Sequence, residues 1–231
     1  MNIQGLQKLT LLDYPEKVAC TIFTAGCNFR CPFCHNASLV THIDVGRNIP
    51  TEQVLSFLKK RLGVLDGICI SGGEPLLQPD LEEFISRVKE MGYFVKLDTN
   101  GSSADLLRRL VEKRLLDYVA MDIKNAPEKY SATIGMKEYN MENVFQSVDF
   151  LLSGAVSYEF RTTVVREFHK REDFDSIGRW IKGAGRYYLQ NFQDSGDLIR
   201  PGLRAYTKEI LVQALEVVRR NVPNAELRGI E

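Results

Sequence analysis

The chain has 231 residues, which is enough for one large α/β domain. Its 30 Lys and Arg residues balance 30 Asp and Glu residues, so the bulk charge favours neither nucleic acid nor an anionic membrane as a partner. The first residues lack the basic and apolar regions of a signal peptide, and no apolar run is long enough to span a membrane. We therefore expect a cytoplasmic protein that works through a local site.

The predicted elements alternate between strands and helices along the chain. Six strands separated by helices imply a parallel sheet with helical crossovers. Six βα units are too few for a closed eight-stranded barrel, and a cysteine-rich segment stands where a doubly wound sheet would carry its nucleotide-binding fingerprint. We therefore expect an α/β fold with a partial (β/α)6 barrel, in which an open parallel sheet carries outer helices. The predicted strands are residues 18–24, 67–70, 93–97, 118–123, 157–165 and 187–192, and the predicted helices are residues 51–62, 80–92, 103–114, 141–152, 174–182 and 205–220.

No internal repeat, low-complexity stretch or linker divides the sequence. We expect one domain over residues 1–231. It would consist of an extended lead-in over residues 1–16, the barrel over residues 17–200, and a C-terminal helix and tail over residues 201–231.

Three cysteines lie within eight residues, directly after the first predicted strand. Cys27, Cys31 and Cys34 are spaced Cys-x-x-x-Cys-x-x-Cys, and three thiolates leave one coordination position of a tetrahedral metal open. His35 could close a zinc site, but neighbouring side chains rarely both reach one metal, and the chain has no second ligand pair. The pattern favours an open iron–sulfur cluster over the alternative, a zinc-binding interaction module.

The total of five cysteines is odd, and their clustering is unlike a disulfide framework, so we expect them to be reduced. Cys20 and Cys69 lie inside predicted buried strands, where a free cysteine packs as a small apolar residue.

Most of the other unusual residues lie at the carboxyl ends of predicted strands, where parallel α/β folds bind ligands, whereas Arg161 lies inside a strand. Two glycines would let the backbone approach a ligand closely, and Glu74 could accept hydrogen bonds from an amino group, although such a run is also a common turn. The two carboxylates of Asp98 and Asp122 could perform acid–base chemistry, bind a cation or hold sugar hydroxyls. Lys124 could pair with a ligand carboxylate or be solvated. Arg161, which lies inside a strand, must be paired or face the barrel interior. These residues are Gly72, Gly73, Glu74, Asp98, Asp122, Lys124 and Arg161. The two remaining candidates for chemistry, His42 and His169, lie in polar surroundings and are expected at the surface.

These motifs resemble a known family. The pattern Cys-x-x-x-Cys-x-aromatic-Cys, with Phe33 as the aromatic residue, resembles the signature of radical S-adenosylmethionine (SAM) enzymes, and Gly-Gly-Glu-Pro at residues 72–75 is similar to their SAM-amino motif. The runs at residues 34–36, 98–101 and 122–124 resemble the glycyl-radical enzyme activases. Residues 6–10 together with 13–15, residues 188–192 and residues 226–229 resemble the branch that activates anaerobic ribonucleoside-triphosphate reductase.

The resemblance implies a 4Fe–4S cluster with three irons on Cys27, Cys31 and Cys34, and with SAM chelating the fourth iron. Asp98 and Asp122 match two aspartates that help to hold a monovalent cation in pyruvate formate-lyase activases. Those activases have a histidine near the adenosine where this chain has Gln193, and the chain lacks the second cysteine cluster of a ferredoxin-like insertion. The residues implied to contact SAM are His35, Asn36, Gly72, Gly73, Glu74, Asp98, Thr99, Lys124 and Arg161.

The resemblance also implies the activity. The cluster would cleave SAM reductively, and the 5′-deoxyadenosyl radical would generate a glycyl radical on an anaerobic ribonucleotide reductase. A flavodoxin- or ferredoxin-type protein would donate the electron. The alternatives are activation of another glycyl-radical enzyme of the pyruvate formate-lyase type, or a small-molecule reaction like that of the 7-carboxy-7-deazaguanine synthases. An open barrel would admit a protein loop as substrate.

Overall fold

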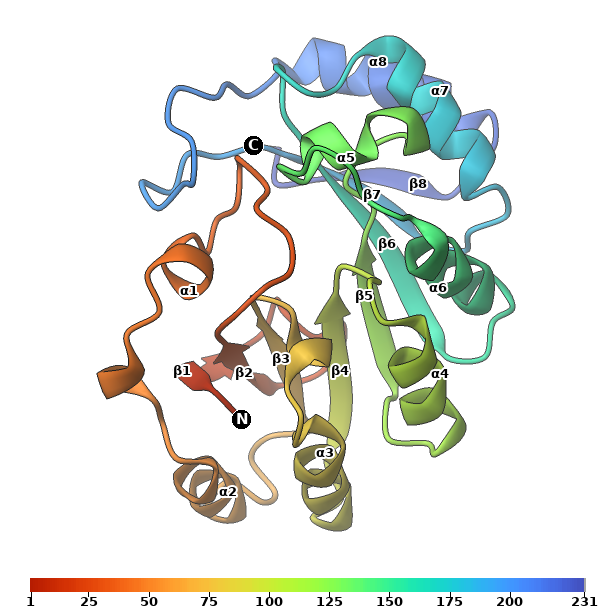
Figure 1. The fold of residues 1–231 in the computed structure, drawn as a ribbon. Helices are drawn as coiled ribbons and strands as arrows, with labels where there is room; N and C mark the ends of the chain where they lie inside the picture. Colours follow the sequence, from red (N-terminus) through yellow and green to blue (C-terminus); the bar gives the residue numbers. More distant parts are fainter. Residues whose placement is uncertain (231) are drawn as a thin grey trace.

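The computed structural model describes residues 1–230, which form a single curved sheet of eight strands in chain order (Figure 1). The first two strands are antiparallel and all other neighbouring pairs are parallel. The six predicted strands are all present, and the expected open α/β fold is confirmed. The strands are β1 (Ile3–Thr10), β2 (Ala19–Thr24), β3 (Gly67–Gly72), β4 (Phe94–Thr99), β5 (Tyr118–Asp122), β6 (Ser157–Val164), β7 (Tyr187–Asn191) and β8 (Ala225–Arg228).

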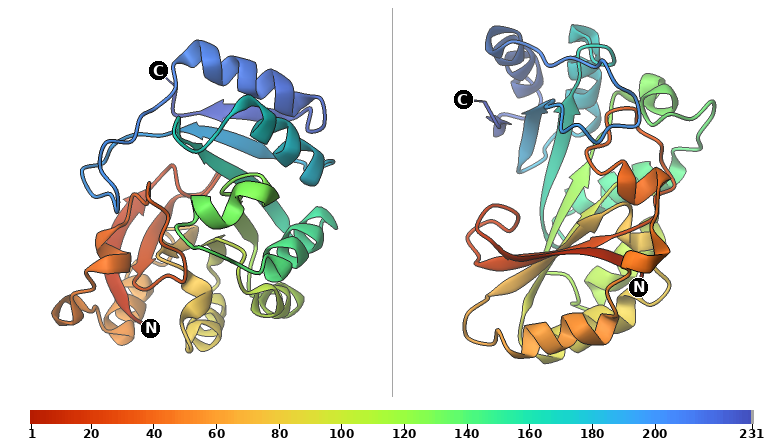
Figure 2. Two further views of the ribbon diagram at one scale, coloured as in Figure 1. Left: turned by 45° about the horizontal axis from the view of Figure 1, so that its top comes forward. Right: turned by 90° about the vertical axis from the view of Figure 1, so that its left-hand side faces the viewer.

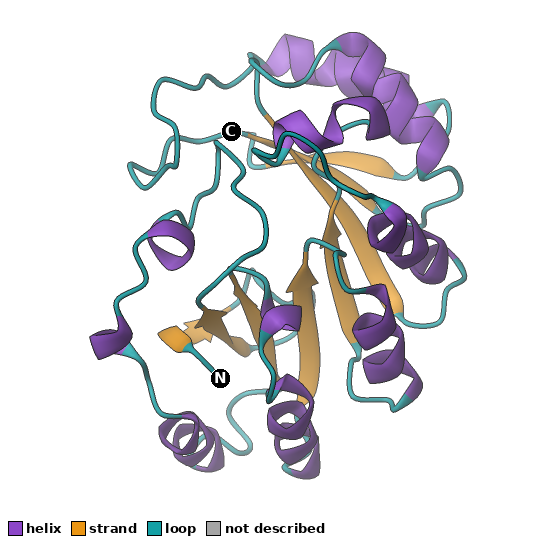
Figure 3. Ribbon diagram, in the orientation of Figure 1, coloured by secondary structure: helices purple, strands orange, loops and turns teal. Residues whose placement is uncertain are grey.

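Six longer helices cover the outer, convex side of the sheet, whereas loops gather at its open side (Figure 3). No helix within residues 1–230 is long and apolar enough to cross a membrane. The outer helices are α2 (Thr51–Lys59), α3 (Leu81–Glu90), α4 (Ala104–Glu112), α6 (Glu142–Leu152), α7 (Arg171–Trp180) and α8 (Lys208–Arg219). The short elements are α1 (Ser38–Thr41), α5 (Tyr130–Thr133), and the 3-10 turns η1 (Val45–Arg47), η2 (Pro75–Leu77) and η3 (Pro127–Lys129).

The two edge strands of the sheet were not predicted. β1 forms a hairpin with β2 at one edge, and β8 lies at the other edge (Figure 2, red and blue). Most residues of both strands are partly buried or exposed, because an edge strand has a single neighbour. Neither strand therefore carries the continuous apolar run by which the central strands were recognised.

The two faces of the sheet differ in chemistry. The convex face packs on apolar helix stripes, such as Leu107, Leu110 and Val111 of α4, which recur at helical spacing and are buried. The opposite face buries charged side chains, among them Lys96 of β4 and Glu159 of β6. Because side chains alternate along a strand, Lys96 shares this face with Asp98, and Glu159 shares it with Arg161.

The ion pair between Glu159 and Arg228 attaches the last strand to the barrel. The Arg228 guanidinium donates to both carboxylate oxygens of Glu159, at 3.0 and 3.2 Å, and the Tyr118 hydroxyl donates a third bond at 3.1 Å. The Glu159 side chain is only 2% exposed. Removal of the guanidinium would thus leave a buried carboxylate without its cation.

We predict that Arg228→Ala lowers the free energy of unfolding by about 2–4 kcal/mol, because breaking one side of a buried pair is strongly destabilising. Urea unfolding followed by circular dichroism measures the change. Arg220→Ala, at an exposed position after α8, is the control and should change the stability by less than about 0.5 kcal/mol. Equal effects of the two substitutions would show that the pair does not stabilise the sheet.

Candidate functional site

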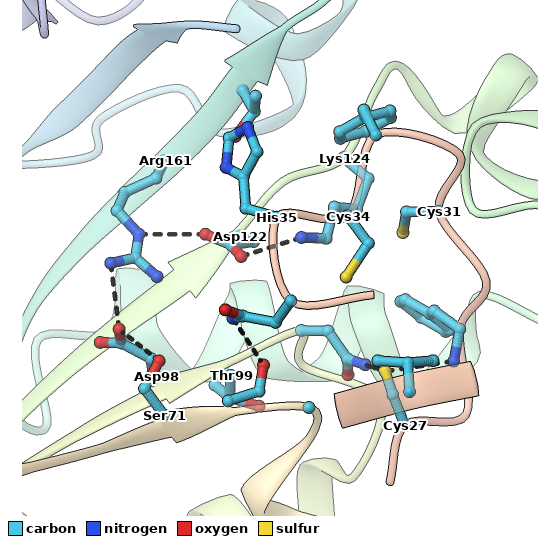
Figure 4. Close-up of a pocket in the computed structure, with 18 of the residues that line it drawn as sticks. Cys27, Cys31, Cys34, His35, Ser71, Asp98, Thr99, Asp122, Lys124 and Arg161 are labelled. Atoms are coloured by element: carbon cyan, nitrogen blue, oxygen red, sulfur yellow. Dashed lines mark hydrogen bonds and ion pairs between the residues drawn. The ribbon is translucent and has the colours of Figure 1, made fainter. Parts of the chain in front are cut away.

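A cavity of about 230 Å³ opens at the carboxyl ends of the parallel strands (Figure 4). Every site residue predicted from the sequence lines it except Glu74. Segments far apart in the chain are thus brought together by the parallel pairing, as the strand-end argument required. The cavity is also lined by residues that the sequence did not single out, including Ser71 and Thr163. Thr163 lies two residues after Arg161, so the two-residue period of a strand could have found it.

The cysteine loop is held from two sides. The Arg30 N–H donates to the Ile134 carbonyl at 2.9 Å, and the Arg200 N–H donates to the Pro32 carbonyl at 2.9 Å. Within the loop the Cys34 N–H donates to the Cys31 carbonyl at 3.0 Å. These bonds fix the loop against the segments that precede α6 and α8.

The three sulfur atoms of the loop face the same cavity from separate positions (Figure 4). Among residues 1–230, no three His, Cys, Asp or Glu side chains gather closely enough to hold a single metal ion. Each cysteine of an iron–sulfur cluster binds a different iron, and Cys27, Cys31 and Cys34 all line this one cavity.

Burial favours the protonated form of all three thiols. Burial raises the pKa of Cys27 to about 11 and that of Cys31 to about 12. Burial also raises the pKa of Cys34. A metal centre that binds the thiolates would offset this cost, and its binding would release protons.

The glycines of the Gly-Gly-Glu-Pro turn permit contact between two backbone segments. The Gly73 N–H donates to the Thr24 carbonyl and the Glu74 N–H donates to the Gly26 carbonyl, both at 2.8 Å. A Cβ atom at Gly73 would lie 2.1 Å from the Gly26 oxygen, and one at Gly72 would lie 2.3 Å from the Thr24 oxygen. Gly72 also has φ of +111°, which favours glycine. The glycines thus lock the turn onto the segment that leads into Cys27, in addition to lining the cavity.

Glu74 takes a different place from the one expected. Its side chain is fully buried and does not line the cavity, so direct contact with a ligand amino group is not what this geometry provides. Its carboxylate accepts the Thr99 hydroxyl at 2.8 Å, the Asn100 N–H at 2.7 Å and the Leu76 N–H at 3.1 Å. Glu74 therefore braces the loop after β4, because these donors would otherwise be buried without a partner.

A network of ion pairs forms the floor of the cavity (Figure 4). Arg161 joins two strand ends, donating to Asp122 at 3.0 Å and to Asp98 at 3.3 Å. The Lys124 ammonium donates to Asp122 at 2.9 Å. Burial alone would raise the pKa of Asp122, but the charges of Arg161 and Lys124 outweigh it and hold the pKa well below the usual range. The expectation that Arg161 must be paired is met by this bridge.

The donor set around the two aspartates does not fit a bound monovalent cation. Asp98 also accepts bonds from the Lys96 ammonium and from the Ser71 hydroxyl, the latter at 3.1 Å. Both carboxylates are therefore already paired with protein cations, and a further cation would meet positive charge.

A second cavity adjoins the first beyond His35. The His35 ring stacks on Phe192, with centroids 5.7 Å apart and an interplanar angle of 20°. Burial lowers the pKa of His35, which keeps the ring neutral near pH 7. Gln193 lines this second cavity with Gln190.

The prediction that His169 lies at the surface is wrong, whereas His42 is exposed as expected. The His169 ring is fully buried between Phe33 and Phe174. Its Nε2 lies 2.9 Å from the Lys124 carbonyl, which can only accept, so Nε2 carries the proton and Nδ1 accepts the Val165 N–H at 3.1 Å. His169 thus fixes the backbone of Lys124, and the polar residues beside it in sequence concealed this role.

The protein-family model described as "Radical SAM superfamily" matches residues 21–181 of the chain. The chain belongs to the radical SAM superfamily. Members of this superfamily use a 4Fe–4S cluster and SAM, which agrees with the three thiols that line the cavity. The matched region runs from β2 to the end of α7 and includes every residue of the charged floor.

Two relatives indicate which group of radical SAM enzymes the chain resembles. The chain is 34% identical over 195 residues to "Putative glycyl-radical enzyme activating enzyme MJ1227" of Methanocaldococcus jannaschii, covering 83% of this chain and 80% of that protein. It is 27% identical over 154 residues to the pyruvate formate-lyase-activating enzyme of Clostridium pasteurianum, covering 64% of this chain and 63% of that protein. The resemblance to glycyl-radical enzyme activases is therefore confirmed, and the chain is an enzyme of this kind.

Solved structures share the fold at low sequence identity. SuiB of Streptococcus suis, bound to its precursor peptide SuiA, superposes with a TM-score of 0.70 at 14% identity, covering 90% of this chain and 48% of that protein. A domain of a pyruvate-formate lyase-activating enzyme from Bacteroides vulgatus superposes with a TM-score of 0.58 at 16% identity, covering 71% of this chain and 99% of that domain. At such identities the likeness supports the partial barrel alone.

We predict that the buried Glu74 makes stability depend on pH near neutrality. Burial raises the pKa of Glu74 to about 7, although three hydrogen bonds act in the opposite direction. The folded protein therefore holds a proton that the unfolded chain releases above its ordinary pKa of about 4.5, so the stability contributed by Glu74 falls as the pH rises to about 7 and is level above that.

Urea unfolding of the wild type and Glu74→Gln at several pH values tests this prediction. The difference in unfolding free energy, wild type minus variant, should fall by about 2–3 kcal/mol between pH 5 and pH 8. Glu83→Gln, at an exposed position on α3, should show no such trend. A difference that rises with pH would mean that the hydrogen bonds dominate and that Glu74 ionises at or below its ordinary pKa.

Proposed function

We propose that this chain activates an anaerobic ribonucleoside-triphosphate reductase by generating a glycyl radical on it. The observation that carries the proposal is the composition of one cavity, in which three cysteine thiols lie opposite a cationic floor at the carboxyl ends of the strands. Thiols suit an iron–sulfur cluster, and cations suit the carboxylate of SAM. When bound, a reduced 4Fe–4S cluster would supply the electron that cleaves SAM into methionine and a 5′-deoxyadenosyl radical.

The residues of the cavity divide the work of binding. Cys27, Cys31 and Cys34 would hold the cluster. The backbone of Gly72 and Gly73, which lines the cavity, would approach the amino group of SAM, while Glu74 keeps the neighbouring loop in place. Lys124 and Arg161 would attract the SAM carboxylate.

The wall formed by His35 and Asn36 would receive the rest of SAM. The Asn36 amide donates to the Gly72 carbonyl at 3.2 Å and so joins the cysteine loop to the glycine turn. The His35 ring, stacked on Phe192, stands between the main cavity and the second cavity and would contact the adenosine. Thr99 would contribute both to the cavity wall and to the Glu74 brace.

The choice of a ribonucleotide reductase as partner rests on the branch-specific runs of the sequence. Two of these runs, residues 188–192 in and after β7 and residues 226–229 in and after β8, contribute Gln190, Asn191, Arg228 and Gly229 to the second cavity. The proposal includes a cytoplasmic, anaerobic setting and a flavodoxin- or ferredoxin-type electron donor. A second candidate, activation of a pyruvate formate-lyase, is favoured by the relative in Clostridium pasteurianum.

Electron paramagnetic resonance tests the choice of partner. The anaerobically reconstituted protein is mixed with SAM, a chemical reductant and either a candidate anaerobic ribonucleotide reductase or a pyruvate formate-lyase. We expect the doublet of a glycyl radical on the reductase, and its loss when the partner's glycine is replaced by alanine. A doublet on the lyase alone would support the second candidate, and no doublet on any glycyl-radical protein would contradict both.

We predict that Cys31→Ala abolishes SAM cleavage and removes most bound iron, since the cluster would lose one of three protein ligands. Iron and sulfide analysis, the visible spectrum and release of 5′-deoxyadenosine measure the effect. Cys20→Ala is the matched control, because Cys20 is fully buried in β2 and does not line the cavity. It should retain iron and activity. A colourless wild type that contains zinc would instead identify a zinc-binding module.

A further inference from the structure

Lys96 is a buried cation beneath the floor of the cavity. It lies in β4, two residues before Asp98 and on the same face of the strand, and it is 2% exposed. Its ammonium group donates to Asp98 and lies 3.8 Å from the sulfur of Cys69 on β3. It does not line the cavity, so it cannot be solvated there in the way that a strand-end lysine would be. A lysine buried so completely needs a reason, because desolvation of an ammonium is costly.

The Lys96 ammonium completes the set of partners around Asp98. One oxygen of Asp98 accepts from Lys96, and the other accepts from Arg161 and from the Ser71 hydroxyl. At Asp122, one oxygen accepts from Arg161 and the other from Lys124. All four carboxylate oxygens therefore have a cationic partner within the protein.

The sum of charges decides what such a floor attracts. Three cations (Lys96, Lys124 and Arg161) and two carboxylates (Asp98 and Asp122) leave one net positive charge. A small metal cation placed beside the aspartates would meet this positive charge. An anionic group in the cavity would be attracted to it, and the attraction is strong because the site is largely shielded from water.

We propose that Lys96 is a built-in cation of the SAM site, which takes the place of a bound monovalent cation and lets the floor receive the SAM carboxylate without any metal ion. This inference rests on the proposed function, because it takes SAM as the ligand. Lys96 is a positioning residue: it acts through Asp98, by neutralising one carboxylate and leaving Arg161 and Lys124 with surplus positive charge. Without Lys96 the floor has no net charge, and the Asp98 oxygen that it releases becomes a ligand for Na⁺ or K⁺.

The first test needs only the wild-type protein. The equilibrium constant for SAM binding to the reconstituted, cluster-containing protein is measured in Na⁺, K⁺ or tetramethylammonium chloride at equal ionic strength. Tetramethylammonium is too large and too weakly coordinating to replace a metal ion between carboxylates. We expect SAM affinity to differ by less than about twofold among the three salts, because only general screening acts. An affinity that is lost in tetramethylammonium and restored by K⁺ or Na⁺ would overturn the inference.

The second test removes the internal cation. Lys96→Met keeps an unbranched side chain of similar length without the charge, and we expect it to weaken SAM binding by about tenfold or more in tetramethylammonium. Na⁺ or K⁺ should then restore at least about fivefold of the affinity, which a purely structural lysine would not show. A variant that binds SAM as tightly as the wild type, or one that no cation rescues, would contradict the assignment.

A lysine that does not line the cavity provides the matched control. Lys89→Met removes another lysine that pairs with an aspartate, at 2.7 Å from Asp117, which directly precedes β5 and so lies at the opposite end of the strands from the cavity. This variant should leave SAM binding and its salt response unchanged. If the wild type binds no SAM in any salt, the proposed function itself fails. If it binds SAM only with a metal cation, the function stands and the role of Lys96 is refuted.

Discussion

Charge buried on the concave face of the sheet is the constraint on which the site depends. The Arg161 side chain of β6 can be as little as 15% exposed because β4 and β5 each present an aspartate to it, at 3.3 and 3.0 Å. That bridge in turn requires the parallel register in which Asp122 pairs with Arg161 across the sheet. A shift of one residue would turn one member of each pair to the helix side and strand an unpaired charge in the core. The ion pairs therefore help to specify the register that assembles the cavity.

The loops above the sheet depend on one another in a similar way. The glycine turn is bonded to the segment before Cys27, and Glu74 in that turn is bonded to Thr99 and Asn100 after β4. The Asn100 amide also donates to Asn28 in the cysteine loop at 3.0 Å. Three segments from different parts of the sequence thus form a closed ring of backbone and side-chain bonds. Such a ring can present ligands in fixed positions although each of its members is a loop.

The sequence predicted the central sheet well, because β2–β7 are short apolar runs separated by amphipathic helices. It did not reveal β1 and β8, whose single neighbours allow polar residues. Arg161 was recognised as a charge that needs a partner, yet the same rule applies to Lys96, which lies inside a predicted strand at the same two-residue spacing from Asp98. The hydrogen-bond partners of the Glu74 side chain could not be predicted, because the donors lie 25 and 26 residues away in the chain. The burial of His169 is hidden in the sequence for the same reason: it comes from Phe33 and Phe174, not from its polar neighbours in the chain.

Lys124 connects the two halves of the site. Its ammonium is paired with Asp122. Burial raises the pKa of Cys31, and the positive charge of Lys124 acts in the opposite direction and lowers it. One side chain therefore lowers the cost of forming thiolates in the cysteine loop and also supplies positive charge to the floor. His169 holds the backbone carbonyl of this residue at 2.9 Å, so the position of the lysine does not depend on its ion pair alone. The His169 ring is buried, and its bond to the Lys124 carbonyl does not involve the ammonium. The backbone of Lys124 can therefore stay fixed when the charge around the ammonium changes. A site that holds thiolates on one side of this lysine and an anionic ligand on the other requires such a fixed position.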